Sequence, residues 1–320
     1  MAELIRCEKL KKFFSTPKGM LHAVDGVSFN LFEGETLGVV GESGCGKSTL
    51  GRVVIHLSDS TGGNIYYKDR DITRVDKKQL RELRKEMQMI FQDPYSSVNP
   101  RMTVSQTIAE PLIIEGEMSR GDREKRVDQL MEIVGLAPRL RMSYPHELDG
   151  GRRQRVSIAR ALALNPRFIV CDEPVSALDV SIQAQVLNLM QDLQEQLGLT
   201  YMFITHDLSV VKYISNSILV MYLGQTVERC ESQRLFENPV HPYTKALLSA
   251  VPVPDIHKKT ERIILKGELT SPINPRPGCR FASRCIYARE ECRQKEPVLE
   301  EVEPGHLAAC HLLHAGHVTG

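Results

Sequence analysis

One short segment carries the residue types that bind a phosphate chain. Residues 41–49 read Gly-Glu-Ser-Gly-Cys-Gly-Lys-Ser-Thr and fit the P-loop pattern G-x-x-x-x-G-K-[ST]. Glycines let the backbone curl until successive N–H groups point at one anion. A lysine can then neutralise the outer phosphates, and a hydroxyl can ligate Mg²⁺. The predicted contacts to a nucleoside triphosphate are Gly41, Ser43, Gly44, Cys45, Gly46, Lys47, Ser48 and Thr49.

The sequence on either side of this loop predicts the elements that must position it. Residues 36–40 are apolar and predict a buried strand, and residues 48–57 predict a helix. The start of that helix adds partial positive charge where the phosphates would lie. A chance match in a Gly/Ser-rich turn is the alternative, and the flanking strand and helix argue against it.

Three further apolar segments end in side chains suited to metal and water chemistry. Residues 168–173 predict a buried strand ending in two acids, the form of a Walker B strand, with Asp172 placed for Mg²⁺ and Glu173 for polarising an attacking water. Residues 200–205 lead into His206, and residues 87–91 lead into Gln92. In isolation, the histidine could be a structural hydrogen-bonding group and the glutamine a solvated loop residue.

Composition limits the partners and the location of the protein. The 320 residues contain 41 Lys+Arg and 40 Asp+Glu, so the net charge of +1 gives no general attraction to nucleic acid or anionic lipid. No apolar run approaches the length of a membrane span, and the first 14 residues lack the apolar core of a signal peptide. We expect a soluble, cytosolic protein with reduced cysteines, whose contact with a membrane depends on a partner.

A fifth element, Leu-Asp-Gly-Gly-Arg at residues 148–152, opens a helix that stops before Asn165-Pro166. Over residues 4–250 the chain resembles the ATP-binding-cassette (ABC) ATPases, because six motifs follow one another in the order found in that family. They are the P-loop, Gln92, this Gly-Gly helix, Asp172-Glu173, the Ser-Ala-Leu-Asp string at 176–179 and His206. The resemblance implies an α/β fold with a RecA-like P-loop NTPase core, an antiparallel β subdomain and a helical subdomain at about 93–160. It places the cassette at residues 1–250.

In that family two cassettes dimerise head to tail, and each ATP lies between one P-loop and the Gly-Gly signature of the other chain. The resemblance gives Glu173 the role of general base and places His206 at the γ-phosphate. It makes Gln92 a contact to Mg²⁺ and water, and it assigns Mg²⁺ ligation to Ser48, supported by Asp172. The remaining nucleotide contacts that it implies are Asp149, Gly150 and Gly151 of the signature and Phe14, or alternatively Phe13, on adenine.

The signature departs from the family pattern L-S-G-G-Q because Asp149 replaces serine and Arg152 replaces glutamine. A carboxylate about 4 Å from a phosphate charge costs on the order of 4 kcal/mol at an effective dielectric constant of about 20. Arg152 could offset part of that cost, and Asp149 could also simply cap the helix. We predict that the ATP facing this signature turns over poorly and that a non-identical ATPase supplies the better signature.

The segment between Gln92 and the signature predicts helices. Apolar residues recur at helical spacing after a Ser119-x-x-Asp122 start, and a second amphipathic helix begins near Ile182 and ends at Gly198.

Residues 91–101 and 241–248 resemble the peptide and nickel branch of importer ATPases. That resemblance implies a dipeptide or oligopeptide importer ATPase on the cytoplasmic face of the membrane, with two transmembrane permease subunits and an extracytoplasmic solute-binding protein. Nickel import is the alternative. A soluble ABC ATPase of DNA repair or chromosome maintenance would carry a long coiled coil between the P-loop and the signature, and this sequence has no long heptad run there.

The last part of the chain, residues 251–320, is rich in proline and holds four of the eight cysteines, at positions 279, 285, 292 and 310. Four thiolates suit an iron–sulfur cluster or tetrahedral zinc. The absence of tight C-x₂₋₄-C pairs favours [4Fe–4S], as does the resemblance of this tail to the C-terminal domain of peptide importers. Zinc is an open alternative because His306, His311 and His314 lie near the cysteines in the sequence. Four buried thiols that bind no metal are a further alternative.

Overall fold

A computed structural model describes residues 2–315 except 94–97, 252–261, 266 and 268–270. Part of the predicted loop at 93–101 and part of the predicted C-terminal domain therefore lie outside the described residues. The chain divides into two compact units. Unit 1 comprises Met1–Phe32, Thr36–Arg74 and Thr205–Gly320, and unit 2 comprises Glu33–Glu35 and Val75–Ile204.

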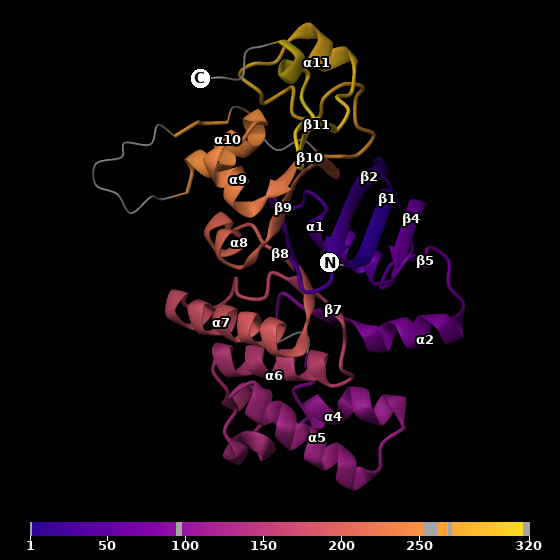
Figure 1. The fold of residues 1–320 in the computed structure, drawn as a ribbon, viewed down its shortest axis with the longest axis vertical. Coiled ribbons are helices and arrows are strands. Elements are labelled where there is room, and N and C mark those ends of the chain that lie inside the picture. The colour runs from indigo at the N-terminus through magenta and orange to yellow at the C-terminus, as the bar shows by residue number, and fades with distance from the viewer. Residues whose placement is uncertain (1, 94–97, 252–261, 266, 268–270, 316–320) are drawn as a thin grey trace. The chain divides into compact units, whose positions relative to one another are not determined.

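Unit 1 contains an antiparallel sheet formed by the N-terminal residues (Figure 1). Its strand order is β2-β1-β4-β5, and β1 pairs with β2 along almost the whole length of both strands. The bounds are Glu3–Thr16 for β1, Gly19–Phe32 for β2, Gly62–Tyr67 for β4 and Arg70–Asp71 for β5.

The other strands of unit 1 pair in the order β11-β12-β10-β9-β3. β3 (Thr36–Val40) runs parallel to β9 (Ser217–Tyr222), whereas β10 (Gln225–Glu231), β12 (His306–Ala308) and β11 (Glu300–Glu303) continue antiparallel. All five residues of β3 are buried, which confirms the predicted buried strand before the P-loop. The helices of unit 1 are α1 (Lys47–Val54), α8 (Leu208–Ile214), α9 (Ser232–Glu237), α10 (Pro242–Ser249) and α11 (Glu290–Gln294), followed by the 3₁₀ turn η3 (His311–Ala315).

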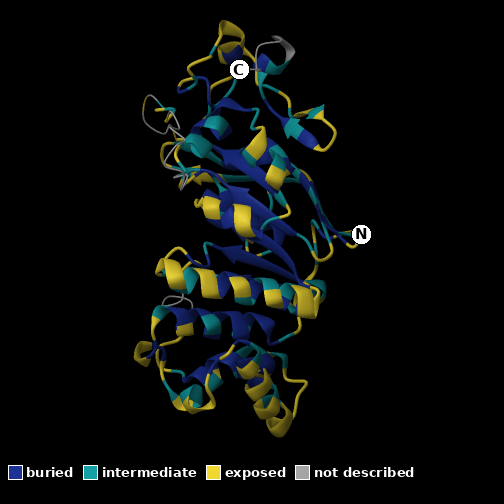
Figure 2. Cartoon of the chain, turned by 60° about the vertical axis from the view of Figure 1, so that its left-hand side comes forward, coloured by how far each residue is buried: buried dark blue, intermediate teal, exposed yellow. Residues whose placement is uncertain are grey.

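Unit 2 contains three parallel strands in the order β8-β7-β6. Every residue of β7 and β8 is buried, as the unbroken apolar runs in their sequences require for parallel strands. Figure 2 shows these strands in dark blue and the outer faces of the helices in yellow. The strands are β6 (Met87–Ile90), β7 (Phe168–Asp172) and β8 (Thr200–Ile204). The helices are α2 (Lys77–Glu86), α4 (Val104–Glu115), α5 (Arg120–Ile133), α6 (Gly150–Leu162) and α7 (Val180–Leu197), with 3₁₀ turns η1 (Pro138–Met142) and η2 (Pro145–Glu147).

Local sequence signals set the helix ends in unit 2. Ser119 caps α5 by accepting a hydrogen bond from the Asp122 N–H, which confirms the predicted start. Gly198 ends α7 with a φ of 64°, a left-handed conformation that glycine adopts without strain. Thr103 caps α4 in a box with Gln106.

A buried side-chain contact joins the C-terminal strand β12 to β10 in unit 1. His306 on β12 and Glu228 on β10 are fully buried, with Nε2 and Oε1 2.7 Å apart. The Glu228 carboxylate also accepts hydrogen bonds from the N–H groups of Val240 and His241, at 2.7 and 2.9 Å. Three polar partners thus surround this carboxyl group, as a buried polar group requires. None of the helices in the described part of the chain combines the length and hydrophobicity needed to cross a bilayer.

The buried His241 makes the stability of unit 1 sensitive to acid. Its Nδ1 accepts from the Tyr243 N–H at 3.1 Å to cap α10, and burial lowers its pKa from 6.5 to about 4. Between these two values the unfolded chain binds the proton more readily than the folded chain, so stability falls as the pH falls from about 6.5 to about 4. The contribution lost between pH 7.5 and pH 5 is about 2 kcal/mol.

We expect His241→Asn, which keeps a capping acceptor but does not titrate, to remove that part of the pH dependence. Urea unfolding at pH 7.5 and pH 5 measures the difference for both chains. A comparison at pH 8 isolates the cost of the altered cap and packing. An unchanged difference between the two pH values would show that another group is responsible.

Candidate active site

The P-loop in unit 1 adopts a conformation that only glycine permits at two positions. Gly46 has a φ of 106°, and a Cβ there would lie 1.9 Å from the Ala23 carbonyl oxygen. Gly41 has a φ of 150°, and its Cβ would lie 2.2 Å from the Met221 carbonyl oxygen. The loop therefore packs backbone against backbone between β3 and α1. Without side chains in the way, its N–H groups and the start of α1 can approach a phosphate closely.

Lys47 lies within this curl. Its side chain is buried, and Nζ donates to the carbonyl oxygens of Gly41 at 2.7 Å and Glu42 at 3.1 Å. Ser48 and Thr49 follow in the first turn of α1, where their backbone N–H groups belong to the positive end of the helix. Burial raises the pKa of the Cys45 thiol, whose Sγ is 3.9 Å from Lys47 Nζ, so Cys45 is a protonated packing group at neutral pH.

In unit 2 the end of β7 brings two predicted catalytic side chains together. Gln92 Nε2 donates to Glu173 Oε2 at 2.8 Å, although the residues are 81 positions apart. Glu173 has a φ of 48°, a left-handed conformation that is unusual for a non-glycine residue and concentrated at functional sites. Its N–H donates to the Ile204 carbonyl at 2.8 Å, so the turn is held to the end of β8. Asp172, one residue earlier, is buried at the end of the strand.

The signature residues occupy the first turn of α6. Asp149 accepts from the Arg152 N–H at 2.8 Å and caps the helix, and its Oδ2 lies 3.4 Å from Arg152 Nε. Capping and partial charge compensation thus occur together. Gly151 has no room for a side chain, because a Cβ would lie 2.6 Å from Ile182 Cγ2. Gly150 is nearly as crowded, at 3.0 Å from Leu178 Cδ2.

The two aromatic candidates on β1 differ in their surroundings. Phe13 stacks on His22 with ring centroids 3.9 Å apart. Phe14 is 38% exposed, and Lys12 Nζ lies over its ring, 4.9 Å from the ring centre. His206 is exposed in the turn before α8, next to Asp207, which caps that helix.

The four C-terminal cysteines lie near one another, and the metal site expected of them is not tested by the structure. Burial raises the pKa of Cys279 to about 12 and of Cys310 to about 11, and the neighbouring cysteines contribute to both shifts. Among the described residues no three Cys, His, Asp or Glu side chains are close enough to hold a metal ion. The zinc alternative also weakens, because His306 is paired with Glu228 and His311 Nε2 contacts the Lys295 carbonyl at 2.9 Å.

Sequence reasoning missed the C-terminal contacts to the P-loop. Arg284 binds the carboxylate of Glu42 across 242 positions, and Tyr243 Oη accepts from the Glu42 N–H. No local pattern marks such distant partners. One signal was present: an acid inside a phosphate-binding loop calls for a compensating cation.

Known proteins match nearly the whole chain. Residues 24–176 match the family model "ABC transporter", and residues 227–292 match "Oligopeptide/dipeptide transporter, C-terminal region". The chain is 53% identical to the putative oligopeptide transport ATP-binding protein YkfD of Bacillus subtilis, over 97% of this chain and 95% of that protein. It is 54% identical to the oligopeptide transport ATP-binding protein OppF of Salmonella typhimurium, over 91% of this chain and 88% of that one.

A solved structure extends the likeness to the fold. The ATP-binding cassette MJ0796, in a dimeric post-hydrolysis state bound to ADP and Pi, matches with a TM-score of 0.66 and 29% identity. The match covers 72% of this chain and 99% of the cassette. The arrangement of mixed sheet and helices is therefore that of an ABC ATPase, as the resemblance implied.

Proposed function

The chain belongs to the ABC transporter family, and we propose that it is the ATP-hydrolysing subunit of an importer of dipeptides or oligopeptides. The observation that carries the substrate class is the identity of about half of all residues to oligopeptide and dipeptide transport ATP-binding proteins along nearly the full chain. The match of residues 227–292 to the oligopeptide/dipeptide transporter C-terminal region favours peptides over nickel.

We propose the following division of labour in ATP hydrolysis. Lys47 neutralises the outer phosphates, Phe14 stacks on adenine and His206 contacts the γ-phosphate. Ser48, Gln92 and Asp172 would hold Mg²⁺, which neutralises charge on the β- and γ-phosphates. Glu173 accepts the proton of the attacking water, and its 2.8 Å contact with Gln92 orients the carboxylate for that task.

A second chain completes the site in this proposal. The P-loop faces the signature of a partner ATPase, and Asp149 with Arg152 gives this chain a poor signature to offer in return. We therefore favour a pair with a non-identical ATPase. Two transmembrane permease subunits and an extracytoplasmic solute-binding protein would complete the importer, with this chain on the cytoplasmic face of the membrane.

Peptide uptake by cells tests the function. We expect Glu173→Gln to lower uptake of labelled dipeptides and oligopeptides at least about 100-fold, because a general base contributes about 10²–10⁴-fold. Glu195→Gln changes an exposed residue of α7 in the same way and serves as the matched control. Loss of nickel uptake with normal peptide uptake would move the assignment to the metal branch.

The signature asymmetry predicts a gain of activity. In the complex with its partner ATPase, Glu173→Gln silences the site on this chain's own P-loop, so the remaining turnover occurs opposite this signature. In that background, Asp149→Ser with Arg152→Gln should raise ATP hydrolysis about tenfold or more, which corresponds to about 1.4 kcal/mol of activation free energy. Asp76→Ser, at the cap of α2, is the matched control. An unchanged rate would show that Asp149 acts only as a cap.

The cysteine cluster supports a separate, weaker proposal. The proximity of Cys279, Cys285, Cys292 and Cys310, and the family match of their segment, support a [4Fe–4S] cluster or zinc. The thiols as placed do not fit a bound metal, so binding would require them to close together. Anaerobic purification with iron, sulfide and zinc analysis tests the proposal. A metal content near zero, with all four thiols reactive after unfolding, would leave them as packing residues.

A further inference from the structure

The P-loop carries an acid at its second position. Glu42 follows Gly41 directly, and its side chain is only 27% exposed. A carboxylate in a phosphate-binding loop repels the polyanion that the loop must hold, and its partial burial limits screening by water. We therefore expect ATP binding at this loop to be stronger when the charge of Glu42 is compensated from within the protein.

Arg284 provides that compensation. Its two terminal nitrogens bind the two oxygens of Glu42, at 2.6 and 3.1 Å, and the arginine side chain is 9% exposed. The paired, two-point geometry holds the carboxylate in one orientation. The hydrogen bonds to Glu42 raise the pKa of Arg284 above its usual range, so the guanidinium stays charged.

The backbone of Glu42 is held as firmly as its side chain. Its N–H donates to Tyr243 Oη at 2.9 Å, and its carbonyl accepts from Lys47 Nζ at 3.1 Å. Tyr243 in turn packs against Tyr222 and Phe281, with ring centres 4.7 and 5.4 Å apart. Lys47 and the aromatic cluster of Tyr222, Tyr243 and Phe281 thus both contact Glu42, through Lys47 Nζ and Tyr243 Oη.

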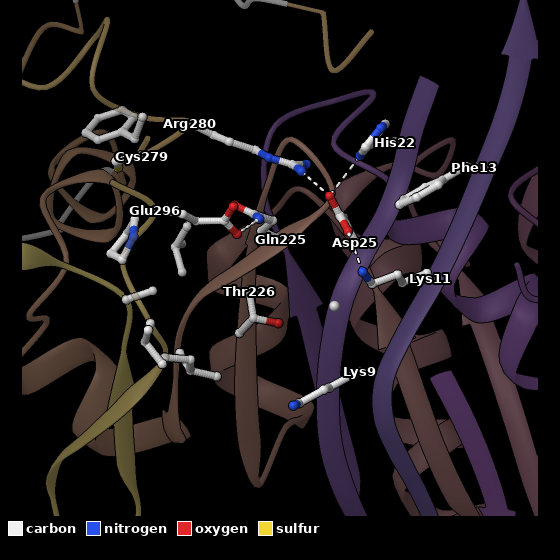
Figure 3. A pocket seen from close by; sticks show the side chains of 17 residues that line it. Lys9, Lys11, Phe13, His22, Asp25, Gln225, Thr226, Cys279, Arg280 and Glu296 are labelled. Carbon is white, nitrogen blue, oxygen red and sulfur yellow. Dashed lines mark hydrogen bonds and ion pairs between the residues drawn. The ribbon is translucent and has the colours of Figure 1, made fainter. Parts of the chain in front are cut away.

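The segment that presents Arg284 is held by hydrogen bonds within itself and by one ion pair to β2. The Cys279 N–H donates to the Cys292 carbonyl at 2.7 Å, and the Arg284 and Cys285 N–H groups donate to the Phe281 carbonyl at 3.0 Å. Arg280 binds Asp25 on β2 at the edge of a cavity of about 560 Å³ (Figure 3). Phe281, which lies between Arg280 and Arg284 in the sequence, packs against the ring of Tyr222. These contacts hold the backbone around Arg284 within the cysteine-bearing segment.

We propose that Arg284 is a positioning residue of the nucleotide site, through which the C-terminal cysteine-rich segment sets the charge and shape of the P-loop. Arg284 acts through Glu42 and does not touch the nucleotide. The inference rests on ATP binding at residues 41–49, and it assigns the C-terminal region a direct part in that binding.

The test measures dissociation constants of MgATP and MgADP for the full chain by titration calorimetry. We expect Arg284→Met to weaken MgATP binding about tenfold or more, or about 1.4 kcal/mol, and MgADP binding less, because ADP carries less charge. Arg284→Lys keeps the charge but not the paired geometry, so its affinity for MgATP should lie between those of the original chain and of Arg284→Met. Removing both charges, with Arg284→Met and Glu42→Gln, should restore the affinity to within about threefold of the original chain. Arg289→Met, an exposed arginine of the same segment, is the matched control.

Two outcomes would overturn the inference. One is an Arg284→Met chain that binds MgATP as tightly as the control. The other is a double variant that remains as weak as Arg284→Met. If Arg284→Met does not fold by thermal melting, Arg284→Lys with and without Glu42→Gln decides in its place. An original chain that binds no MgATP would instead refute the nucleotide-site assignment itself.

Discussion

The nucleotide site depends on a backbone loop that must pack against other backbone with no side chain between them. The carbonyl oxygens of Ala23 and Met221 lie where side-chain atoms of residues 46 and 41 would otherwise be. Those carbonyls belong to β2 and β9, so these two strands limit the conformation of the loop by direct backbone contact. The same closeness lets the N–H groups face a phosphate.

Compensation of acidic charge is the second recurring feature. Glu42 and Asp149 both bring a carboxylate to a place where we propose that ATP binds, and each contacts an arginine of its own chain. The two pairs differ in strength for physical reasons. Arg284 is nearly buried and binds Glu42 at two points, whereas Arg152 is about half exposed and contacts Asp149 at 3.4 Å. Water and salt screen the second pair much more than the first, so the P-loop is compensated and the signature only partly.

The C-terminal region is tied into unit 1 by several independent contacts. Glu228 and His306 join β10 to β12, Arg280 reaches Asp25 and Tyr243 reaches Glu42. This region therefore shares a compact unit with the P-loop, and the boundary at residue 251 remains a prediction from sequence. The four-cysteine metal site remains a proposal, because spacing along a chain does not fix how closely side chains approach, and no group of metal ligands is found among the described residues.

The sequence by itself determined the nucleotide loop, the buried strands around it, the helix starts at Ser119 and Asp149, and the family. These features depend on local rules, such as glycine's conformational freedom, apolar runs and capping side chains, which are readable within a few residues. Only the tertiary structure decided that Gln92 holds Glu173, that Asp149 is paired as well as capping, and that Arg284 neutralises Glu42. Two of these contacts join residues 81 and 242 positions apart, and the pairing of Asp149 depends on a side-chain geometry that sequence leaves open. Packing and charge in the folded chain determine which of these side chains contact each other.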